Sequence, residues 1–255
     1  MVVNDIQSSL LNKGLVIIKN ENLSNWKILE EALKKPFATT DLSKIHTKTD
    51  SSQINSLRLS AFQSINSLEN WDRIYFSMAK SVLLSLLGPD LLIQRKLNLS
   101  VQMPFDSTSS LGFHTDTLSG QSPFELVMWT PFSRFSGNAG MYYFDRDISR
   151  SIMIRMKDTE EKGLESLKNE FWDFHQFLEI NTDEIALFSG SIFHGNIVNT
   201  TNNTRVSTNC RFKNLYSPEG SNELNERGVG IFYKLLCTSP VTEIGMSYSD
   251  DGVLF

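Results

Sequence analysis

A histidine and an aspartate that could bind the same metal ion, His114 and Asp116, are separated by one residue in the stretch LGFHTDTLSG. In a β-strand, residues two apart point to the same face of the sheet. If this stretch is extended, the imidazole and the carboxylate project into one space. Two ligands do not hold a metal firmly, so a third is expected from a distant part of the chain.

The chain contains three further histidines from which this third ligand could come. We favour His194, because it stands at the end of a well-patterned strand in EIALFSGSIFHGN. His46 lies in a polar stretch and His175 in the segment FWDFHQF, and both are interpreted as structural or surface residues. His114, Asp116 and His194 are therefore the predicted metal ligands and catalytic centre.

Two histidines and one carboxylate form the facial triad of non-haem Fe(II) oxygenases, which leaves coordination positions open. A chelating keto acid can take two of these positions and O2 the third. The far carboxylate of such a dianion needs a cation, for which a bidentate arginine is suited. Arg205 follows His194 by eleven residues, and Ser207, on the same strand face, can donate a hydrogen bond to the same carboxylate.

The composition is that of an ordinary globular protein, with 255 residues, 40% of them hydrophobic and 21% charged. This length suffices for one large domain with a sizeable core. The net charge of −5 and the lack of a basic tail argue against a nucleic-acid partner, and no apolar run is long enough to predict a membrane span. The two cysteines, Cys210 and Cys237, favour a reducing compartment and hence a cytoplasmic protein, with Cys210 facing core packing.

Helix-like patterns dominate the first part of the chain and strand-like patterns the second. Apolar spacing predicts a helix from residue 23 that stops before Pro36, a loop at 38–58 and a long helix at 61–87. Strands are predicted at 12–20, 96–105, 124–132, 140–147, 184–199 and 205–216. Helices followed by many strands indicate a mainly β fold, a sandwich or jelly roll with supporting N-terminal α-helices.

We interpret the chain as a single domain, 1–255, with helical support at 1–92, a jelly-roll core at 93–216 and a C-terminal packing segment at 217–255. The polar interruption within 155–180 is expected to be an inserted helix or lid. The C-terminal segment is apolar enough to pack on the barrel or on a second subunit of a homo-oligomer.

Three motifs occur in an order and spacing that match a known family: HTD at 114–116, FHGN at 193–196 and RVS at 205–207. With them the chain resembles the Fe(II)/2-oxoglutarate-dependent dioxygenases, which have a double-stranded β-helix (jelly-roll) fold. Within that superfamily it looks most like the phytanoyl-CoA-hydroxylase-like group, and in particular like oxygenases of carbohydrate and aminoglycoside biosynthetic clusters of the streptomycin type. The resemblance implies Fe(II), 2-oxoglutarate and O2 as cofactors, and Trp129 and Asn196 as residues that help to hold 2-oxoglutarate.

Polar residues near the predicted mouth of the barrel are candidates for ligand binding. Asn98 and Gln102 lie on one strand whose alternation could point both inward, and Gln102 is a candidate contact for 2-oxoglutarate. Arg211 lies six residues after Arg205, and it could bind an anionic or hydroxyl-rich substrate or pair with Glu125. Asn98, Glu125 and Arg211 are the predicted substrate-binding residues, for a small polar molecule such as a sugar, an aminocyclitol or a nucleotide-sugar.

The expected reaction is a hydroxylation that releases succinate and CO2. Because the resemblance includes the carboxylate of Asp116, which related halogenases lack, halogenation is not expected. Two other classes compete. A metal-dependent, cupin-like sugar isomerase or epimerase would need no keto-acid clamp of the kind that Arg205 and Ser207 offer. A non-catalytic jelly-roll binding module would give no reason to bury an unpaired aspartate, which is costly.

Overall fold

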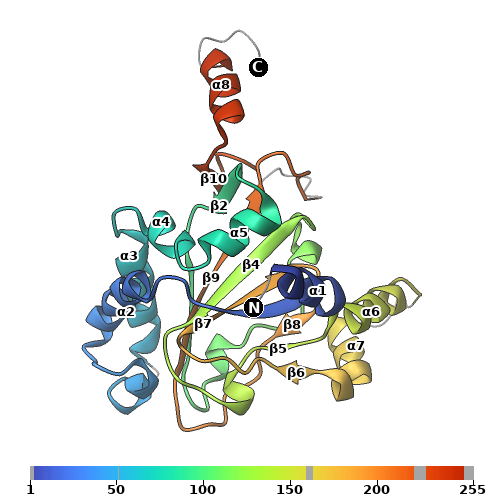
Figure 1. Cartoon of the computed structure of the whole chain (residues 1–255). Helices are drawn as coiled ribbons and strands as arrows, with labels where there is room; N and C mark the ends of the chain where they lie inside the picture. Colours follow the sequence, from blue (N-terminus) through green and yellow to red (C-terminus); the bar gives the residue numbers. More distant parts are fainter. Residues whose placement is uncertain (1–2, 51, 159–162, 221–227, 250–255) are drawn as a thin grey trace.

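The computed structural model describes residues 3–50, 52–158, 163–220 and 228–249. In these parts of the chain the strands form two antiparallel sheets that are flanked by helices (Figure 1). More of the described residues lie in helices than in strands. The expected sheets and N-terminal helices are present. The expected share of β-structure was too high, because helices also occupy parts of the second half of the chain.

The larger sheet carries most of the residues of interest. Its strands, in hydrogen-bonding order, are β1 (Leu15–Lys19), β7 (Glu184–Ser189), β4 (Glu125–Pro131), β9 (Arg205–Asn214), β2 (Leu91–Gln94) and β10 (Tyr233–Cys237), and β3 (Asn98–Gln102) also pairs with β9. The smaller sheet consists of β6 (Gln176–Phe177), β5 (Tyr142–Tyr143) and β8 (His194–Gly195). β2 and β10 were not expected from the sequence.

The alternation along β9 separates a core face from a site face. Val206, Cys210 and Phe212 are buried in the main hydrophobic core. The intervening residues, which include Arg205 and Arg211, point to the opposite face, because successive side chains of a strand alternate. Cys210 therefore packs into the core, in agreement with its predicted orientation.

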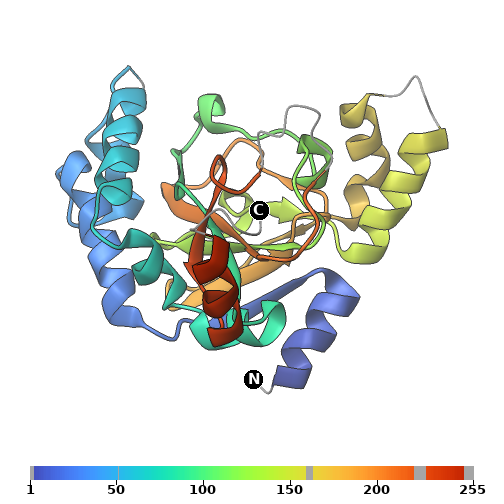
Figure 2. The ribbon, with the colours of Figure 1, turned by 90° about the horizontal axis from the view of Figure 1, so that it is seen from above.

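Eight α-helices are assigned in the described residues. They are α1 (Val3–Lys13), α2 (Leu23–Phe37), α3 (Ile54–Asn66), α4 (Trp71–Phe76), α5 (Lys80–Leu87), α6 (Arg146–Asp158), α7 (Leu164–Phe171) and α8 (Pro240–Ser249). Viewed from above, α2 and α3 lie at one end of the sheets and α6 and α7 at the other (Figure 2). The main core fills the space between α2–α5 and the larger sheet.

The prediction that the first long helix stops before Pro36 is wrong, since α2 includes Pro36 and ends after Phe37. A proline inside a helix leaves the carbonyl four residues earlier without its hydrogen bond. Here that carbonyl belongs to Ala32, and the hydroxyl of Ser64 on α3 donates to it at 2.8 Å. The helix ends instead at Ala38, whose φ of 47° is left-handed.

The single helix predicted at 61–87 is divided into three, α3, α4 and α5. The first break contains Asn70, with a left-handed φ of 54°. At the end of α3, Asn66 donates to the carbonyl of Leu97 and accepts from its amide, so this break joins the helix layer to the start of β3. The predicted loop at 38–58 contains the 3₁₀ helix Leu42–Thr47 and the first turn of α3.

Two predicted strands are shorter than expected. The run at 184–199 gives two strands in different sheets, because β7 ends at Ser189 and β8 begins at His194. His194 thus starts a short strand instead of ending a long one. The run at 140–147 forms only β5, and α6 begins at Arg146.

The polar interruption corresponds to parts of α6 and α7, which contact each other. Ile152 of α6 and Leu167 of α7 are fully buried and pack in a cluster with Phe144 and Phe193. The helix pair is therefore anchored on the residue that precedes His194.

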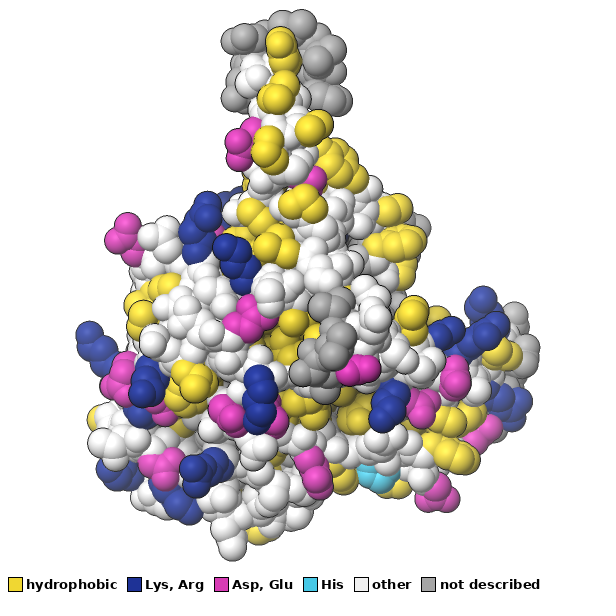
Figure 3. All heavy atoms as spheres, viewed as in Figure 1, with side chains coloured by type: hydrophobic (Ala, Val, Ile, Leu, Met, Phe, Trp, Pro, Cys, Tyr) yellow, Lys and Arg dark blue, Asp and Glu magenta, His cyan; other side chains and the backbone are white. Residues whose placement is uncertain are grey.

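Helix α8 projects from the body of the protein (Figure 1). Its base is held by a hydrogen bond of Tyr216 with Thr242, while Val241, Ile244 and Tyr248 are exposed. Hydrophobic side chains are visible along it in Figure 3. The predicted contact of this segment with a second subunit stays a prediction. Within the described ranges, no helix combines the length and apolarity of a membrane span.

Candidate metal centre and anion pocket

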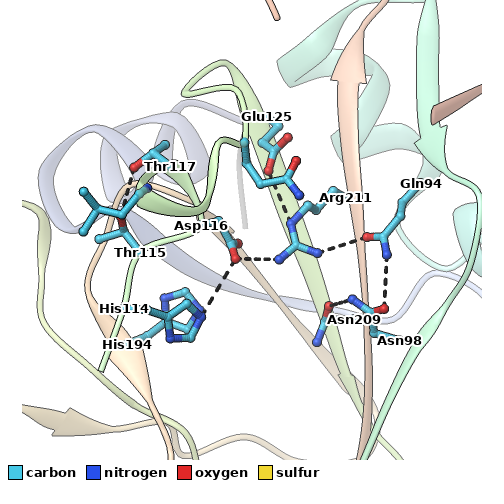
Figure 4. Close-up of polar contacts among 12 residues, drawn as sticks. Gln94, Asn98, His114, Thr115, Asp116, Thr117, Glu125, His194, Asn209 and Arg211 are labelled. Atoms are coloured by element: carbon cyan, nitrogen blue, oxygen red, sulfur yellow. Dashed lines mark hydrogen bonds and ion pairs between the residues drawn. The ribbon is translucent and has the colours of Figure 1, made fainter. Parts of the chain in front are cut away.

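His114 and His194 face each other across an isolated β-bridge. The amide of His114 donates to the carbonyl of His194 at 3.1 Å, and the reverse bond is 2.9 Å. The two ring centroids are 4.3 Å apart. Backbone pairing therefore brings together two imidazoles that are far apart in the sequence (Figure 4).

The orientation of both rings is determined by backbone carbonyls. His114 Nδ1 lies 2.7 Å from the carbonyl oxygen of Gly112, and His194 Nδ1 lies 3.0 Å from that of Ile192. A carbonyl oxygen only accepts, so Nδ1 must carry the proton in each ring. This tautomer leaves the lone pair of each Nε2 free, as in metal-ligating histidines whose other nitrogen donates to the protein.

Asp116 reaches the histidines by a different route from the one predicted. It has helical backbone angles and precedes the 3₁₀ helix Thr117–Ser119, so the 114–116 stretch is not a continuous strand. The amide of Asp116 donates to the carbonyl of Gly190 at 2.8 Å, in the turn that follows β7. Asp116 Oδ1 nevertheless lies 4.0 Å from His114 Nε2.

The three side chains fit a divalent metal ion. One ligand atom from each of His114, Asp116 and His194 lies within 4.8 Å of the others. The carboxylate of Asp116 is buried, and its Oδ2 has no hydrogen-bond partner. A buried carboxylate oxygen without a partner is costly, and a cation at this position would remove that cost.

Burial and neighbouring charges determine the protonation states of Asp116 and His194. Burial alone would raise the pKa of Asp116, but the positive charge of Arg211 holds its pKa below the usual value. Burial lowers the pKa of His194 to about 4, so that its imidazole is neutral at neutral pH. A carboxylate and a neutral imidazole are the protonation states that bind a metal.

Arg205 is a buried cation with no carboxylate partner among the described residues; only 1% of it is exposed. Its Nη2 donates to Ser100 Oγ at 3.0 Å and to the amide oxygen of Asn196 at 3.2 Å, while Nε has no partner. The guanidinium carbon is 5.9 Å from the centre of the Trp129 ring. Burial lowers the pKa of Arg205 to about 10, because keeping the charged guanidinium away from water costs free energy. An anion in the cavity would compensate it.

A cavity of about 390 Å³ connects the two groups. Its walls include most of the predicted site residues, namely His114, Asp116, His194, Trp129, Asn196, Arg205, Asn98 and Arg211. Apolar side chains such as Val127, Met141 and Phe188 complete it. The cavity therefore combines apolar lining residues with a few convergent polar groups, as ligand sites commonly do.

Three predicted residues are buried and are not among the residues that line the cavity. Ser207 is fully buried on the same strand face as Arg205, and its Oγ has no partner. Gln102 is also fully buried and donates to the carbonyl of Ile197, while its Oε1 has no partner. Glu125 is buried and does not line the cavity, and its contact with substrate stays a prediction.

Glu125 belongs instead to a charge network behind Asp116. It accepts a hydrogen bond from Tyr233, and its Oε1 lies 3.4 Å from Arg211 Nε. Burial raises the pKa of Glu125 to about 7. Arg211 was expected either to bind substrate or to pair with Glu125, and the structure contains the pair with Glu125.

Arg211 is the centre of this network (Figure 4). Its Nη2 donates to Asp116 Oδ1 at 2.5 Å, and its Nη1 donates to Gln94 Oε1 at 3.1 Å. Gln94 and Asn209 are not among the predicted site residues. Asn209 could have been found, since it shares the alternation of Arg205 and Arg211, but Gln94 lies on the unpredicted strand β2.

No protein-family model matches the sequence, and a comparison with curated proteins finds no match. Similarity is found among solved structures of non-haem oxygenases. A non-haem monooxygenase, the ThoJ–nickel complex, is 15% identical over 91% of this chain and 83% of that chain, with a TM-score of 0.56. EctD from S. alaskensis with 2-oxoglutarate and 5-hydroxyectoine is 13% identical over 84% and 77%, with a TM-score of 0.57.

A third similar structure is SnoK, a non-haem α-ketoglutarate-dependent carbocyclase from nogalamycin biosynthesis. It is 12% identical over 90% of this chain and 94% of that chain, with a TM-score of 0.53. The chain therefore has the fold of these enzymes. The similar structures include proteins with bound nickel, iron and 2-oxoglutarate, and this chain contains a His–Asp–His cluster.

Proposed function

We propose that this protein is an Fe(II)- and 2-oxoglutarate-dependent oxygenase in which His114, Asp116 and His194 bind the metal. One observation carries the proposal. Three atoms that are free to act as ligands converge in the same cavity as the buried cation Arg205, which has no carboxylate partner in the described parts of the chain. A metal would satisfy the first group and the distal carboxylate of 2-oxoglutarate the second.

The side chains around Arg205 have defined tasks in this proposal. When bound, Fe(II) and 2-oxoglutarate supply the oxidising chemistry with O2, yielding succinate and CO2. Ser100 and Asn196 hold Nη2 of Arg205, which directs the rest of the guanidinium to the ligand. The unpartnered hydroxyl of Ser207 donates to the same carboxylate, and Trp129 forms the wall beside it.

Gln102 has a supporting role in the same proposal. Its amide nitrogen is held by the carbonyl of Ile197, so the side chain keeps one orientation behind the 2-oxoglutarate site. Its unpartnered Oε1 can accept a hydrogen bond from a bound water.

The finer assignments from the sequence belong to the same proposal. The two sheets together form a double-stranded β-helix, and residues 1–255 form one oxygenase domain of the phytanoyl-CoA-hydroxylase-like group. The substrate is a small polar molecule; a sugar, an aminocyclitol or a nucleotide-sugar is the class suggested by the resemblance to antibiotic-cluster oxygenases. Small substrates also agree with the 5-hydroxyectoine in the similar EctD structure.

The test is anaerobic addition of Fe(II) and 2-oxoglutarate, followed by visible absorbance. We expect a weak charge-transfer band near roughly 500 nm, as this metal class shows when a keto acid chelates it. The band is lost in His194→Ala. It persists in the matched control His175→Ala, because His175 stacks on Trp172 outside the cavity.

Absence of the band in the wild-type protein, with Fe(II) binding demonstrated by calorimetry, would contradict the proposal and favour the cupin-like isomerase. Absence of both the band and metal binding would favour the binding module. Loss of the band in His175→Ala as well would show that any histidine substitution disturbs the fold, and would remove the support for His194 as a ligand.

A further inference from the structure

Three side-chain amides connect Arg211 to the cavity wall in a relay (Figure 4). Arg211 Nη1 donates to Gln94 Oε1 at 3.1 Å. Gln94 Nε2 then donates to Asn98 Oδ1 at 3.1 Å, and Asn98 Nδ2 donates to Asn209 Oδ1 at 2.9 Å. The relay crosses β2, β3 and β9, and it ends in the cavity, which both Asn98 and Asn209 line.

The arginine gives the relay one direction. A side-chain amide can normally be turned end for end, and only its hydrogen-bond partners decide which end is oxygen. A guanidinium has donors only, so Gln94 must present its oxygen to Arg211 and its nitrogen to Asn98. The same reasoning passes along the relay, and Asn209 must present its oxygen to Asn98.

The last amide therefore turns its nitrogen to the cavity. Both hydrogens of Asn209 Nδ2 are left without a partner among the described residues, and in Figure 4 this nitrogen points away from Asn98. The nearby carboxylates do not offset this excess of donors. Glu125 lies beside Arg211 and does not line the cavity. Asp116 Oδ1 pairs with Arg211, and its free Oδ2 is assigned to the metal.

We propose that this relay selects a substrate that presents a hydrogen-bond acceptor, a carboxylate or a carbonyl, to Asn209, and that it disfavours an ammonium group at this position. The inference rests on the proposed function, because it describes the substrate of the same cavity. It narrows the candidate substrates, since an aminocyclitol would bring cationic donors to a place where the wall already presents the amide donor of Asn209. An acidic or keto-bearing molecule satisfies that wall.

Two substitutions reverse the polarity at the cavity wall. Asn209→Asp keeps the oxygen that accepts from Asn98 and replaces only the cavity-facing nitrogen. Gln94→Glu acts from a distance, because Gln94 does not line the cavity. A carboxylate there still accepts from Arg211 but cannot donate to Asn98. Asn98 and Asn209 must then both turn over, which presents the oxygen of Asn209 to the ligand.

The probes are cyclohexanecarboxylate and cyclohexylammonium, which have the same ring and opposite polarity. Their binding is measured by calorimetry without O2, with Fe(II) and saturating 2-oxoglutarate so that the carboxylate probe does not occupy Arg205. We expect the wild type to bind the carboxylate at least ~10-fold more tightly, the effect of one hydrogen bond to a charged group. Asn209→Asp and Gln94→Glu should both invert this preference.

A control separates the relay from simple charge. In an Asn98→Leu background the relay is interrupted, so Gln94→Glu adds the same charge but should change the preference much less. Circular dichroism of each variant shows whether it folds, and Asn209→Asp remains as a test if Gln94→Glu does not.

Three results would overturn the inference: binding of neither probe by the wild type, an unchanged preference in the folded variants, or an equal effect of Gln94→Glu with and without Asn98. Failure of the proposed oxygenase function is a separate result, because it appears as a missing absorbance band. The effect of Gln94→Glu with and without Asn98 is still readable in that case, because Arg205 bonds to Ser100 and Asn196 and not to the relay.

Discussion

Replacing Arg205 by methionine should make the ligand-free protein more stable. It should also abolish the stabilisation of the folded state by 2-oxoglutarate. Methionine is similar in length to the stem of arginine and carries no charge. In the structure the guanidinium is buried, with 1% of the residue exposed and Nε unpartnered. It therefore imposes a cost on the folded state for as long as no anion is bound.

The size of that cost follows from the pKa of Arg205, which burial lowers from 12.5 to about 10. Each pKa unit corresponds to ~1.4 kcal/mol, so the cost of the buried charge is ~3 kcal/mol. The variant also loses the hydrogen bonds to Ser100 and Asn196, each contributing ~1 kcal/mol. We expect a net gain of ~1 kcal/mol in the free energy of unfolding.

Urea unfolding with Fe(II), with and without 2-oxoglutarate under anaerobic conditions, measures both effects. At about one hundred times its Kd, 2-oxoglutarate should stabilise the wild type by ~3 kcal/mol and Arg205→Met by almost nothing. Arg134→Met, at an exposed arginine, is the matched control and should behave as wild type. A variant that is destabilised by several kcal/mol, or that still gains stability from 2-oxoglutarate, would refute the reasoning.

Three further outcomes are expected. Burial raises the pKa of Glu125 from 4.5 to about 7, so the folded state holds this proton more tightly than the unfolded state. As the pH rises through this range, the free energy of unfolding of the metal-free wild type should fall by up to ~3 kcal/mol relative to Glu125→Gln. Equal pH profiles of the two proteins in urea titrations would contradict this. Gly195→Ala would place a Cβ 2.5 Å from the hydroxyl of Tyr142 and 2.9 Å from the carbonyl of Gly112 that orients His114. Calorimetry should show metal affinity reduced ~10-fold or more, and unchanged affinity would exclude that role of the carbonyl. Ser64→Ala leaves the proline-freed carbonyl of α2 unpaired and should cost ~1 kcal/mol in thermal unfolding, an effect that should be absent if water replaces the hydroxyl.

Local patterns in the sequence were enough to find most of the polar groups that line the cavity, but not Asn209. The alternation of β9 depends only on neighbouring residues, so the common face of Arg205 and Arg211 could be read from their spacing. The histidines and the aspartate were found by residue type and order. Their roles as ligands stay predictions until metal binding is measured.

Other features depended on partners that no local pattern contains. Asp116 reaches His114 through a 3₁₀ turn pinned to the carbonyl of Gly190, not through an extended strand. The helix predicted at 61–87 is broken where Asn66 bonds to the backbone at Leu97. In both cases a hydrogen bond from a distant segment overrides the local preference.

The polarity of the cavity wall was decided only by the tertiary structure. Three strands must be in register before Arg211, Gln94, Asn98 and Asn209 can form one relay. An asparagine in a sequence can serve as donor or acceptor with equal ease. The sequence by itself determined which chemical groups the protein has. The pairing of strands distant in the chain determined which atom of Asn209 faces the cavity, because the relay of amides that orients Asn209 starts at Arg211, a donor-only group two residues away on the same strand.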